Sequence, residues 1–358
     1  PPAWLTWRFA GDGGEPASPG GSAATRLAGF GQQDGQLSDA VRSPSSSAPV
    51  GGPPAGGGLE DLVTDRSEAS GTGYWSPFAE SYRFDLLELA FGARPRLPRV
   101  AGPADAAGMT PDGIVLAPGA GDNAAAALGL ELAPGDVAIS LGTSGVVSAV
   151  SAAPTADPSG LVAGFADADG AYLPLACTLN GSRVLDAARA ILGVGHAELA
   201  ALALSAPAGA DGLVMVPYLE GERTPNKPRA SAALHGWRLA NSTPAHLARA
   251  AVEGLACLLA DCLDGIGQLG IPLRRVLLIG GGAKSEAFRR IAPSLLGLPL
   301  VVPPPGEYVA EGAARQAARL VLGALPHWER AGAEVFEAAP APFVREQYAA
   351  ARELVLER

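Results

Sequence analysis

Two neighbouring segments of the sequence carry residue types that suit phosphoryl transfer. In the first, Asp122 follows the glycine turn Gly119-Ala-Gly121 at the expected start of an alanine-rich helix. In the second, a strand-like run of residues 136–141 ends in Gly142-Thr143-Ser144-Gly145. A helix N-terminus and a turn of this composition present free N–H or hydroxyl donors, which can hold phosphate. We therefore expect Asp122 to supply a base and the second turn to bind phosphate, although each segment alone also fits a purely structural turn or hairpin.

A dinucleotide-binding fold is the sharper alternative for the first segment. Residues 114–117 read as a strand, and Gly119-x-Gly121-x-x-Ala124 then fits the glycine fingerprint at a helix start. Two residues argue against it. Asp122 would face the pyrophosphate with a like charge, and the acidic residue expected after the second strand is instead Asp136, which precedes a strand.

Composition narrows the class of protein. The chain has 358 residues, 48% of them hydrophobic, which favours a packed protein of two domains. Its net charge of −10 disfavours nucleic acid and anionic membrane surfaces as partners. Cys177, Cys257 and Cys262 form no C-x-x-C pair, so disulfides and zinc are not expected. With no apolar run long enough to span a bilayer, we expect a soluble, cytoplasmic protein.

Sequence patterns typical of strands, turns and helices indicate an α/β organisation. Residues 11–58 are rich in Gly, Pro, Ser and Ala, and we predict a disordered insert there, with an ordered loop as the alternative. Residues 276–279 read as a strand that enters the turn Gly280-Gly281-Gly282-Ala283, and Ser285 should cap a helix over 286–296 in which Pro293 makes a kink. Thr243 should cap a long helix that contains Gly254, and we expect close packing to explain the glycine at this position.

Seven segments in this order resemble the FGGY carbohydrate kinases, and within them the xylulokinases of high-GC bacteria. The segments are residues 4–7, 64–75, 119–129, 140–145, 217–225, 280–285 and 307–314. The resemblance implies an α/β, actin-like (ribonuclease H-like) ATPase fold with an incomplete first domain and a complete second domain. Residues 1–130 would be the remnant of the N-terminal sugar-binding domain, 131–325 the C-terminal nucleotide-binding domain, and 326–358 a C-terminal helical tail.

The resemblance also implies roles for individual residues. Asp122 corresponds to the general base that takes the proton from the sugar hydroxyl, and Asn123 lies where relatives contact the sugar. The nucleotide would be bound by Gly142, Thr143, Ser144 and Gly145, by Gly181, and by Gly280, Gly281, Gly282, Ala283 and Ser285. Glycine suits these places because it lets a backbone approach phosphate or base closely. ATP and Mg²⁺ are the implied cofactors, with no metal held by protein ligands alone, and a homodimer is the oligomeric state to test.

The implied reaction is ATP-dependent phosphorylation of D-xylulose to D-xylulose 5-phosphate. Another sugar or polyol of the same family, or a non-catalytic nucleotide-binding remnant, is the alternative. The family's N-terminal Asp-x-Gly-Thr hairpin, which holds Mg²⁺ and phosphate, has no counterpart in the sequence, and Pro2-Ala3 stands where relatives carry His-Asp. We therefore expect a truncated kinase with little activity as this chain alone. Glu222 and Arg223 read as a pair that is structural more often than functional.

Overall fold

The structure is a computed structural model and describes residues 62–110, 113–330 and 332–355. These residues fall into two compact units. Residues 62 and 95–99 belong to one unit, and the remaining described residues belong to the other, called here the larger unit. The predicted insert at 11–58 lies outside the described residues. The site and the elements that position it lie in the larger unit.

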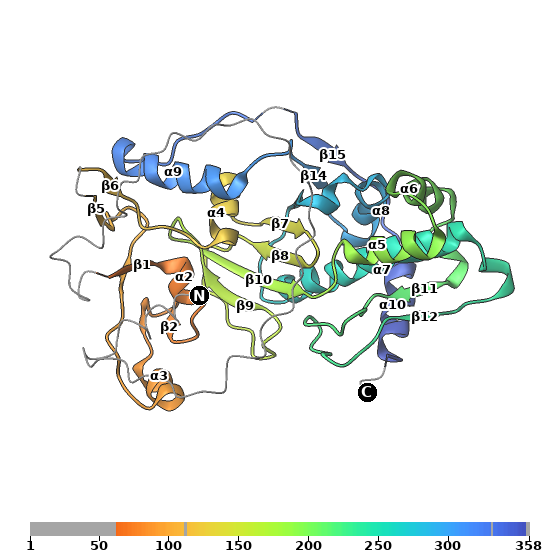
Figure 1. Cartoon of the computed structure of the whole chain (residues 1–358), viewed down its shortest axis with the longest axis horizontal. Helices are drawn as coiled ribbons and strands as arrows, with labels where there is room; N and C mark the ends of the chain where they lie inside the picture. Colours follow the sequence, from red (N-terminus) through yellow and green to blue (C-terminus); the bar gives the residue numbers. More distant parts are fainter. Residues whose placement is uncertain (1–61, 111–112, 331, 356–358) are drawn as a thin grey trace, which may run out of the picture. The chain divides into compact units, whose positions relative to one another are not determined.

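A seven-stranded mixed sheet organises the larger unit (Figure 1). Its strand order is β15-β14-β13-β7-β8-β10-β9, and β13 runs parallel to both β7 and β14. The sheet strands are β7 (Asp136–Leu141), β8 (Gly145–Ala149), β9 (Ala163–Ala166), β10 (Tyr172–Thr178), β13 (Arg275–Ile279), β14 (Leu300–Val302) and β15 (Glu334–Phe336). The shorter strands are β1 (Val63–Asp65), β2 (Trp75–Ser76), β3 (Ser81–Tyr82), β4 (Arg99–Ala101), β5 (Gly108–Met109), β6 (Val115–Leu116), β11 (Val214–Val216) and β12 (Ala233–His235).

Helices cover both faces of this sheet, with α5, α7 and α8 on one side and α4 and α9 on the other (Figure 1). The α-helices are α2 (Arg66–Ser70), α3 (Phe84–Phe91), α4 (Asp122–Gly129), α5 (Arg183–Leu192), α6 (His196–Ser205), α7 (Pro244–Gly267), α8 (Glu286–Leu296), α9 (Tyr308–Leu322) and α10 (Pro342–Glu353). The 3₁₀ turns are η2 (Ala210–Gly212), η3 (Leu239–Asn241) and η4 (Gly281–Lys284).

Alternation along β7 explains why the sheet is covered on both faces. Val137 and Ile139 are fully buried in the core that contains α7. Ala138, between them, belongs to a separate cluster that contains Ala126 of α4 and Tyr308 of α9. Since successive strand side chains point to opposite faces, the apolar run Val137–Ala138–Ile139 must be covered on both faces of the sheet.

Local signals for the helix boundaries are confirmed. The Ser285 side chain accepts a hydrogen bond from the Phe288 N–H at 3.3 Å, and α8 spans the predicted residues. Thr243 likewise accepts from the His246 N–H and caps α7. A Cβ on Gly254 would lie 2.2 Å from the Met215 carbonyl oxygen, so close packing does explain this glycine. The kink at Pro293 stays a prediction.

The strand expected ahead of α4 differs from the prediction. Only Val115–Leu116 forms a strand, β6, and it pairs with β5 in a separate two-stranded sheet. Both of its residues are exposed. A dinucleotide fold needs a buried central strand at this place, so the structure removes the basis of that alternative.

The predicted division at residues 130 and 325 stays a prediction. The stretch after 325 contains the helix α10, and it also contains β15, which pairs with β14 through Val335 and Val301. Residues of this stretch therefore extend the main sheet.

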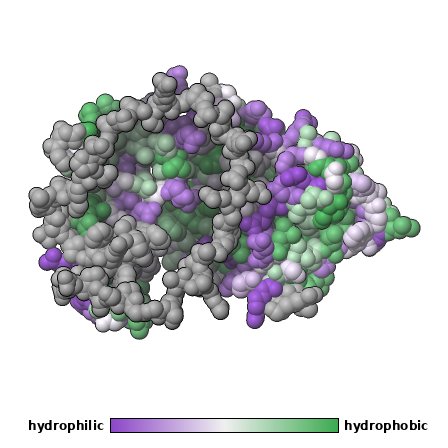
Figure 2. Space-filling view, viewed as in Figure 1, coloured by the Kyte–Doolittle hydropathy of each residue, from purple (hydrophilic) through white to green (hydrophobic). Residues whose placement is uncertain are grey.

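The surface of the larger unit is mixed in character. On the side of the picture that shows α5 to α8, apolar and polar patches alternate (Figure 2). Within the described ranges, no single helix is long and apolar enough to cross a bilayer, and only α5 and α6 together, bent by 86°, reach that length and composition.

Candidate functional site

The candidate base stands exposed at the first position of α4. Gly121 precedes it with extended backbone, at φ −61° and ψ 155°. Asp122 Oδ1 accepts hydrogen bonds from the Asn123 backbone N–H at 2.8 Å and from Asn123 Nδ2 at 3.0 Å. Asn123, predicted to contact sugar, therefore also orients the carboxylate. For Oδ2, no hydrogen-bond partner is found among the described residues.

The charge of Asp122 affects the pKa of an acidic group and a thiol near it. Burial raises the pKa of Glu68, and the charges of Asp65 and Asp122 raise it further. Burial also raises the pKa of Cys177, where the positive charge of Arg223 acts against the negative charge of Asp122. These side chains mark the immediate electrostatic surroundings of the base.

The 142–145 turn joins β7 to β8 and exposes both of its hydroxyl side chains. Thr143 and Ser144 are exposed, whereas Gly145 is buried and donates its N–H to Thr178 Oγ1 at 2.9 Å. The Gly142 carbonyl accepts the Ser182 N–H at 2.8 Å. The turn is thus fixed by its neighbours, whereas the Thr143 and Ser144 side chains are exposed to solvent.

Gly181 lies directly against this turn. An ideal Cβ on Gly181 would lie 2.6 Å from the Gly142 carbonyl oxygen and 2.6 Å from the Ser144 carbonyl oxygen. Real Cβ atoms do not approach backbone this closely, so any larger residue would push the two segments apart. Sequence analysis placed Gly181 and the turn in one nucleotide site, and the structure brings them together.

The 280–283 turn lies at the same edge of the sheet as the 142–145 turn because β13 runs parallel to β7. Ile279 pairs with Ser140, so both strands deliver their following turns to one edge of the sheet. Gly280 has φ +87°, and a Cβ on Gly282 would lie 2.4 Å from the Leu141 side chain. Ser285, predicted to bind nucleotide, caps α8 directly after this turn.

Two cavities border these segments. One of about 90 Å³ joins the base to the strand ends, and one of about 880 Å³ lies against the 280–283 turn. The smaller is lined by Asp122, Asn123, Ala126, Ala138, Ser140, Val146, Ser148, Ile279 and Val309. Four of these, Ala126, Ser140, Ile279 and Val309, line the larger cavity too. The base and the glycine turn therefore border a shared region at the sheet edge.

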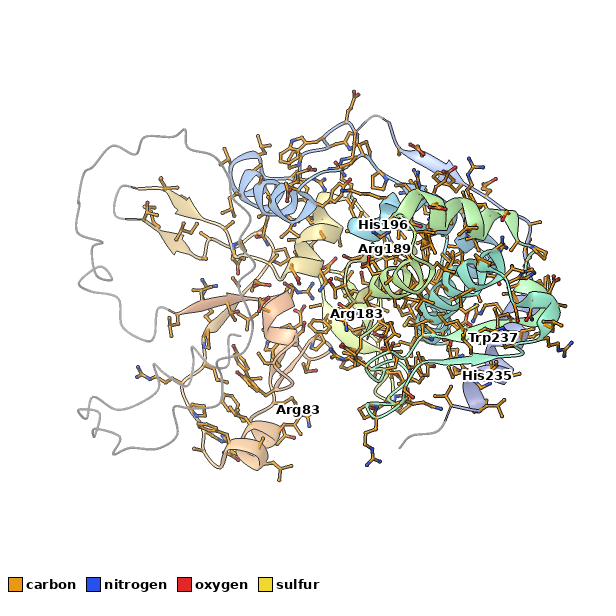
Figure 3. All side chains as sticks on the ribbon, turned by 45° about the vertical axis from the view of Figure 1, so that its right-hand side comes forward. Arg83, Arg183, Arg189, His196, His235 and Trp237 are labelled. Carbon is orange, nitrogen blue, oxygen red and sulfur yellow. The ribbon has the colours of Figure 1, made fainter. Side chains whose placement is uncertain are left out.

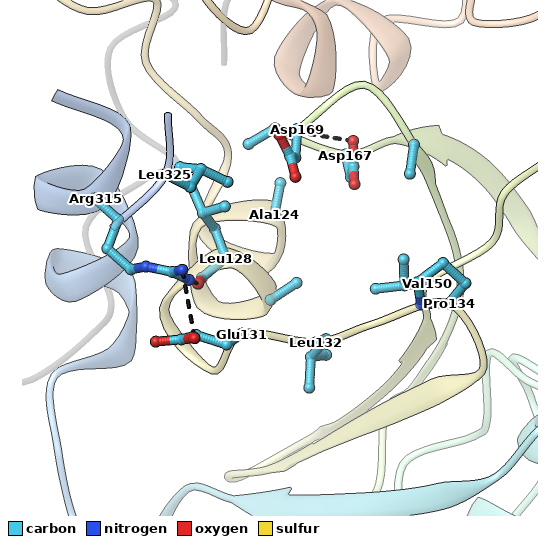
Figure 4. A pocket seen from close by; sticks show the side chains of 13 residues that line it. Ala124, Leu128, Glu131, Leu132, Pro134, Val150, Asp167, Asp169, Arg315 and Leu325 are labelled. Atoms are coloured by element: carbon cyan, nitrogen blue, oxygen red, sulfur yellow. Dashed lines mark hydrogen bonds and ion pairs between the residues drawn. The ribbon is translucent and has the colours of Figure 1, made fainter. Parts of the chain in front are cut away.

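A third cavity, of about 340 Å³, lies beside another face of α4 and contains none of the predicted site residues (Figure 4). Its carboxylates are already paired. Asp167 Oδ1 accepts from Arg66 Nη1 at 3.3 Å and from the Asp169 N–H at 2.9 Å, and Glu131 lies 3.5 Å from Arg315 Nη2. Burial raises the pKa of Asp167 despite these contacts. The Arg66–Asp167 pair joins α2 to the β9–β10 connection, and the Glu131–Arg315 pair joins the segment after α4 to α9.

Glu222 is a buried residue whose role the sequence did not reveal. Its side chain accepts from the Leu179 N–H at 2.5 Å, from Asn180 Nδ2 at 2.8 Å and from the Arg223 N–H at 2.8 Å. No ion pair with the Arg223 guanidinium is found in the described part of the chain. In place of the expected Glu222–Arg223 pair, the Glu222 carboxylate holds the 179–181 loop, which contains Gly181, through the Leu179 N–H and the Asn180 side chain.

The histidines lie away from the turns. His196, at the start of α6, faces Asp186 at 3.4 Å near Arg189 of α5 (Figure 3). His246 contacts Thr243 and Asp211, and His235 lies on β12. Among the described residues, no group of three or more His, Cys, Asp or Glu side chains is arranged to hold a metal ion.

Comparison with known proteins decides the family. The model of the FGGY family of carbohydrate kinases, C-terminal domain, matches residues 137–321. The chain belongs to the FGGY family of carbohydrate kinases. This result confirms the predicted family and its carbohydrate-kinase class. The matched residues include the 142–145 turn, Gly181 and the 280–283 turn.

Individual relatives agree with the family. The chain is 43% identical to a xylulose kinase of Streptomyces rubiginosus over 290 residues, covering 77% of this chain and 58% of that protein. It is also 43% identical to a xylulose kinase of Streptomyces coelicolor, over 73% of this chain and 54% of that protein. The chain therefore spans somewhat more than half the length of these curated relatives.

A solved structure supports the fold. The xylulose kinase from Bifidobacterium adolescentis superposes with a TM-score of 0.76 at 47% sequence identity, covering 98% of this chain and 67% of that one. The actin-like ATPase fold predicted from the sequence is thereby confirmed. The individual site residues stay predictions.

Proposed function

We propose that this chain is part of an ATP-dependent sugar kinase that phosphorylates D-xylulose to D-xylulose 5-phosphate, with Asp122 as the general base. The observation that carries the proposal is the position of Asp122 beside the ends of two strands. Asp122 borders a cavity with Ser140 and Ile279, the strand residues that lead into the 142–145 and 280–283 turns. The proposed base and the two glycine turns thus meet at one sheet edge.

The base acts on the acceptor sugar. An ionised Asp122 takes the proton of the attacking hydroxyl, the sugar oxygen forms a bond to the γ-phosphorus, and the bond from that phosphorus to the β-bridging oxygen breaks to release ADP. Asn123 supports this role because its backbone N–H and its side-chain amide both bind Oδ1 and so restrain the carboxylate. Its position beside the base also suits a contact to the sugar.

The two turns bind the nucleotide. Thr143 and Ser144 offer exposed hydroxyl donors to phosphate. The 280–283 turn with Ser285 takes the adenosine part, and Gly181 packs against the 142–145 turn. Such fixed donors stabilise the charge that spreads over the transferred group.

Mg²⁺ fits this site as an ion carried by the nucleotide. Mg²⁺ usually binds one or two carboxylates and fills its other positions with phosphate oxygens and water. Within the described residues, Asp122 is the predicted site carboxylate, and Thr143 and Ser144 of the 142–145 turn add hydroxyl oxygens, a set that suits a phosphate-bound ion rather than a metal cage. When bound, Mg²⁺ neutralises charge on the phosphates.

Xylulose is the proposed acceptor because the relatives at 43% identity carry that name. A panel of D-xylulose, D-ribulose, gluconate and glycerol tests it by sugar-dependent ADP release. The assay is run on this chain and on the same chain fused to the N-terminal segment of the Streptomyces rubiginosus relative, since in-line transfer needs the phosphate and the acceptor held from both sides. We expect the fusion to be the more active form.

Asp122→Asn tests the mechanism in that assay. The expected result is loss of ADP release with ADP affinity unchanged, because the base acts on the hydroxyl and not on the nucleotide. Near-wild-type turnover of Asp122→Asn would remove Asp122 from the mechanism. Failure of every sugar to release ADP in both proteins would refute the kinase proposal itself.

A further inference from the structure

The turn that presents Asp122 has little rigidity of its own. Gly119 has φ +94°, and glycine adopts this and many other conformations at little cost. The carboxylate is exposed and is bonded only to Asn123 among the described residues. The direction of Asp122 therefore depends on what holds residues 119–121 in place.

Gln316 of α9 holds the beginning of this turn. Its side-chain Nε2 donates to the Gly119 carbonyl at 2.7 Å, and the Gly119 N–H donates to Gln316 Oε1 at 3.1 Å. The residue is 2% exposed. A primary amide carries a donor and an acceptor side by side, so it can bind both polar groups of one residue at once.

Ser67 of α2 holds the end of the turn. Its Oγ accepts the Gly121 N–H at 2.9 Å and donates to Asp65 Oδ1. Asp65 caps α2 and accepts the Ser67 and Glu68 N–H groups at 2.8 and 3.1 Å. Because the Ser67 hydroxyl donates its proton to Asp65, the lone pairs of the Ser67 oxygen face the turn and accept the Gly121 N–H.

We propose that Gln316 and Ser67 are positioning residues that fix the direction of the Asp122 carboxylate. This inference rests on the proposed function, in which Asp122 is the base. The two contacts bracket Gly119 and Gly121, the residues just ahead of Asp122, and both come from buried side chains. The 142–145 turn is held by other contacts, to Ser182 and Thr178, so loss of Gln316 or Ser67 leaves it in place.

The test uses Gln316→Met and Ser67→Ala, with Gln347→Met as the control, because Gln347 is a half-buried glutamine on α10 that lines neither of the two site cavities. In each variant, exchange of the Gly119 and Gly121 amides is followed by NMR, ADP affinity by calorimetry, and kcat and KM by ADP release. We expect Gln316→Met to speed exchange of the Gly119 amide and Ser67→Ala to speed exchange of the Gly121 amide. We also expect kcat to fall on the order of 10²-fold with ADP affinity unchanged, because small displacements of a reacting group cost rates of this order.

The outcomes separate this inference from the proposed function. An unchanged Gly119 amide in Gln316→Met, or an unchanged kcat beside faster exchange, overturns the positioning role. Equal losses of kcat and ADP affinity would indicate a general structural defect and overturn it too. If Gln316→Met fails to fold, Gln316→Glu, which keeps the acceptor and loses the donor, replaces it. Absence of ADP release from the wild-type proteins refutes the proposed function, whereas the amide exchange still decides whether the two side chains hold the turn.

Discussion

Replacing Gly312 with alanine is expected to destabilise the protein, although alanine is the better helix former. Gly312 lies inside α9, where α9 crosses α4. An ideal Cβ there would lie 1.8 Å from the Ala125 carbonyl oxygen and 3.0 Å from the Gly129 nitrogen. Both atoms belong to the backbone of α4 and cannot rotate away as a side chain does.

Two opposing magnitudes decide the sign. Helix propensity favours alanine over glycine by about 1 kcal/mol. The steric shortfall is about 1.6 Å relative to ordinary contact, so the helices must separate or bend, and overpacking of this kind typically costs ~1–3 kcal/mol and occasionally more. Because the shortfall is large, we expect a cost at the upper end of that range, about 2–3 kcal/mol, and so a net loss of about 1–2 kcal/mol, which would lower the thermal midpoint by roughly 2–8 °C in a domain of this size.

Gly265→Ala in α7 is the matched control. A Cβ on Gly265 would lie 3.5 Å from Val162 Cγ2, an ordinary contact. The same substitution should therefore raise the midpoint, since only the propensity gain of up to about 1 kcal/mol remains. Thermal scans of wild type and both variants at one protein concentration measure this. A Gly312→Ala protein as stable as Gly265→Ala would refute the steric argument.

Two other predictions concern buried carboxylates. Glu222→Gln should weaken ADP binding about tenfold by calorimetry, because one N–H donor then faces another donor in the loop that carries Gly181; unchanged affinity would count against this. Burial by itself raises the pKa of Asp136, but the hydrogen bonds and charge of Arg275 overcome this and hold the pKa below its usual value. The pair therefore stabilises the protein above pH ~4 and loses that contribution as pH falls through the folded-state pKa of Asp136. Arg275→Met should lower stability at pH 7 and flatten its decline below pH ~5 in urea titrations, and an unchanged profile would contradict the assignment.

Local elements of the fold were readable from the sequence because their causes are local. Ser285 and Thr243 cap helices through bonds to residues three positions on, a spacing visible in any linear sequence. The strand that enters the 280–283 turn was predicted for the same reason, since a short apolar run before glycines is typical of a strand end. The exposed hairpin strand Val115–Leu116 was misjudged because an apolar run says nothing about which sheet it joins.

The candidate site was readable only in part. The glycines of the 142–145 and 280–283 turns were named from the sequence, but their meeting depends on the parallel pairing of β13 with β7, which composition does not reveal. The contacts of Gln316 were beyond reach, because 197 residues separate it from Gly119. Ser67 carried a weak signal, since Asp65-x-Ser67 is a typical start of a capped helix, but nothing local links it to Gly121.

Helix-interior glycines show where a sequence anomaly has a spatial cause. Gly254 and Gly312 each bring a helix backbone against a carbonyl oxygen, of Met215 and Ala125, at distances that leave no room for a Cβ. Gly265 has the same sequence signature and only an ordinary contact. A glycine inside a helical pattern therefore does not by itself establish a close approach, and the sequence does not name the partner where one exists. At Gly312 the partner is α4, so the glycine that costs α9 helix propensity lets the helix bearing Gln316 lie against the helix that begins with Asp122.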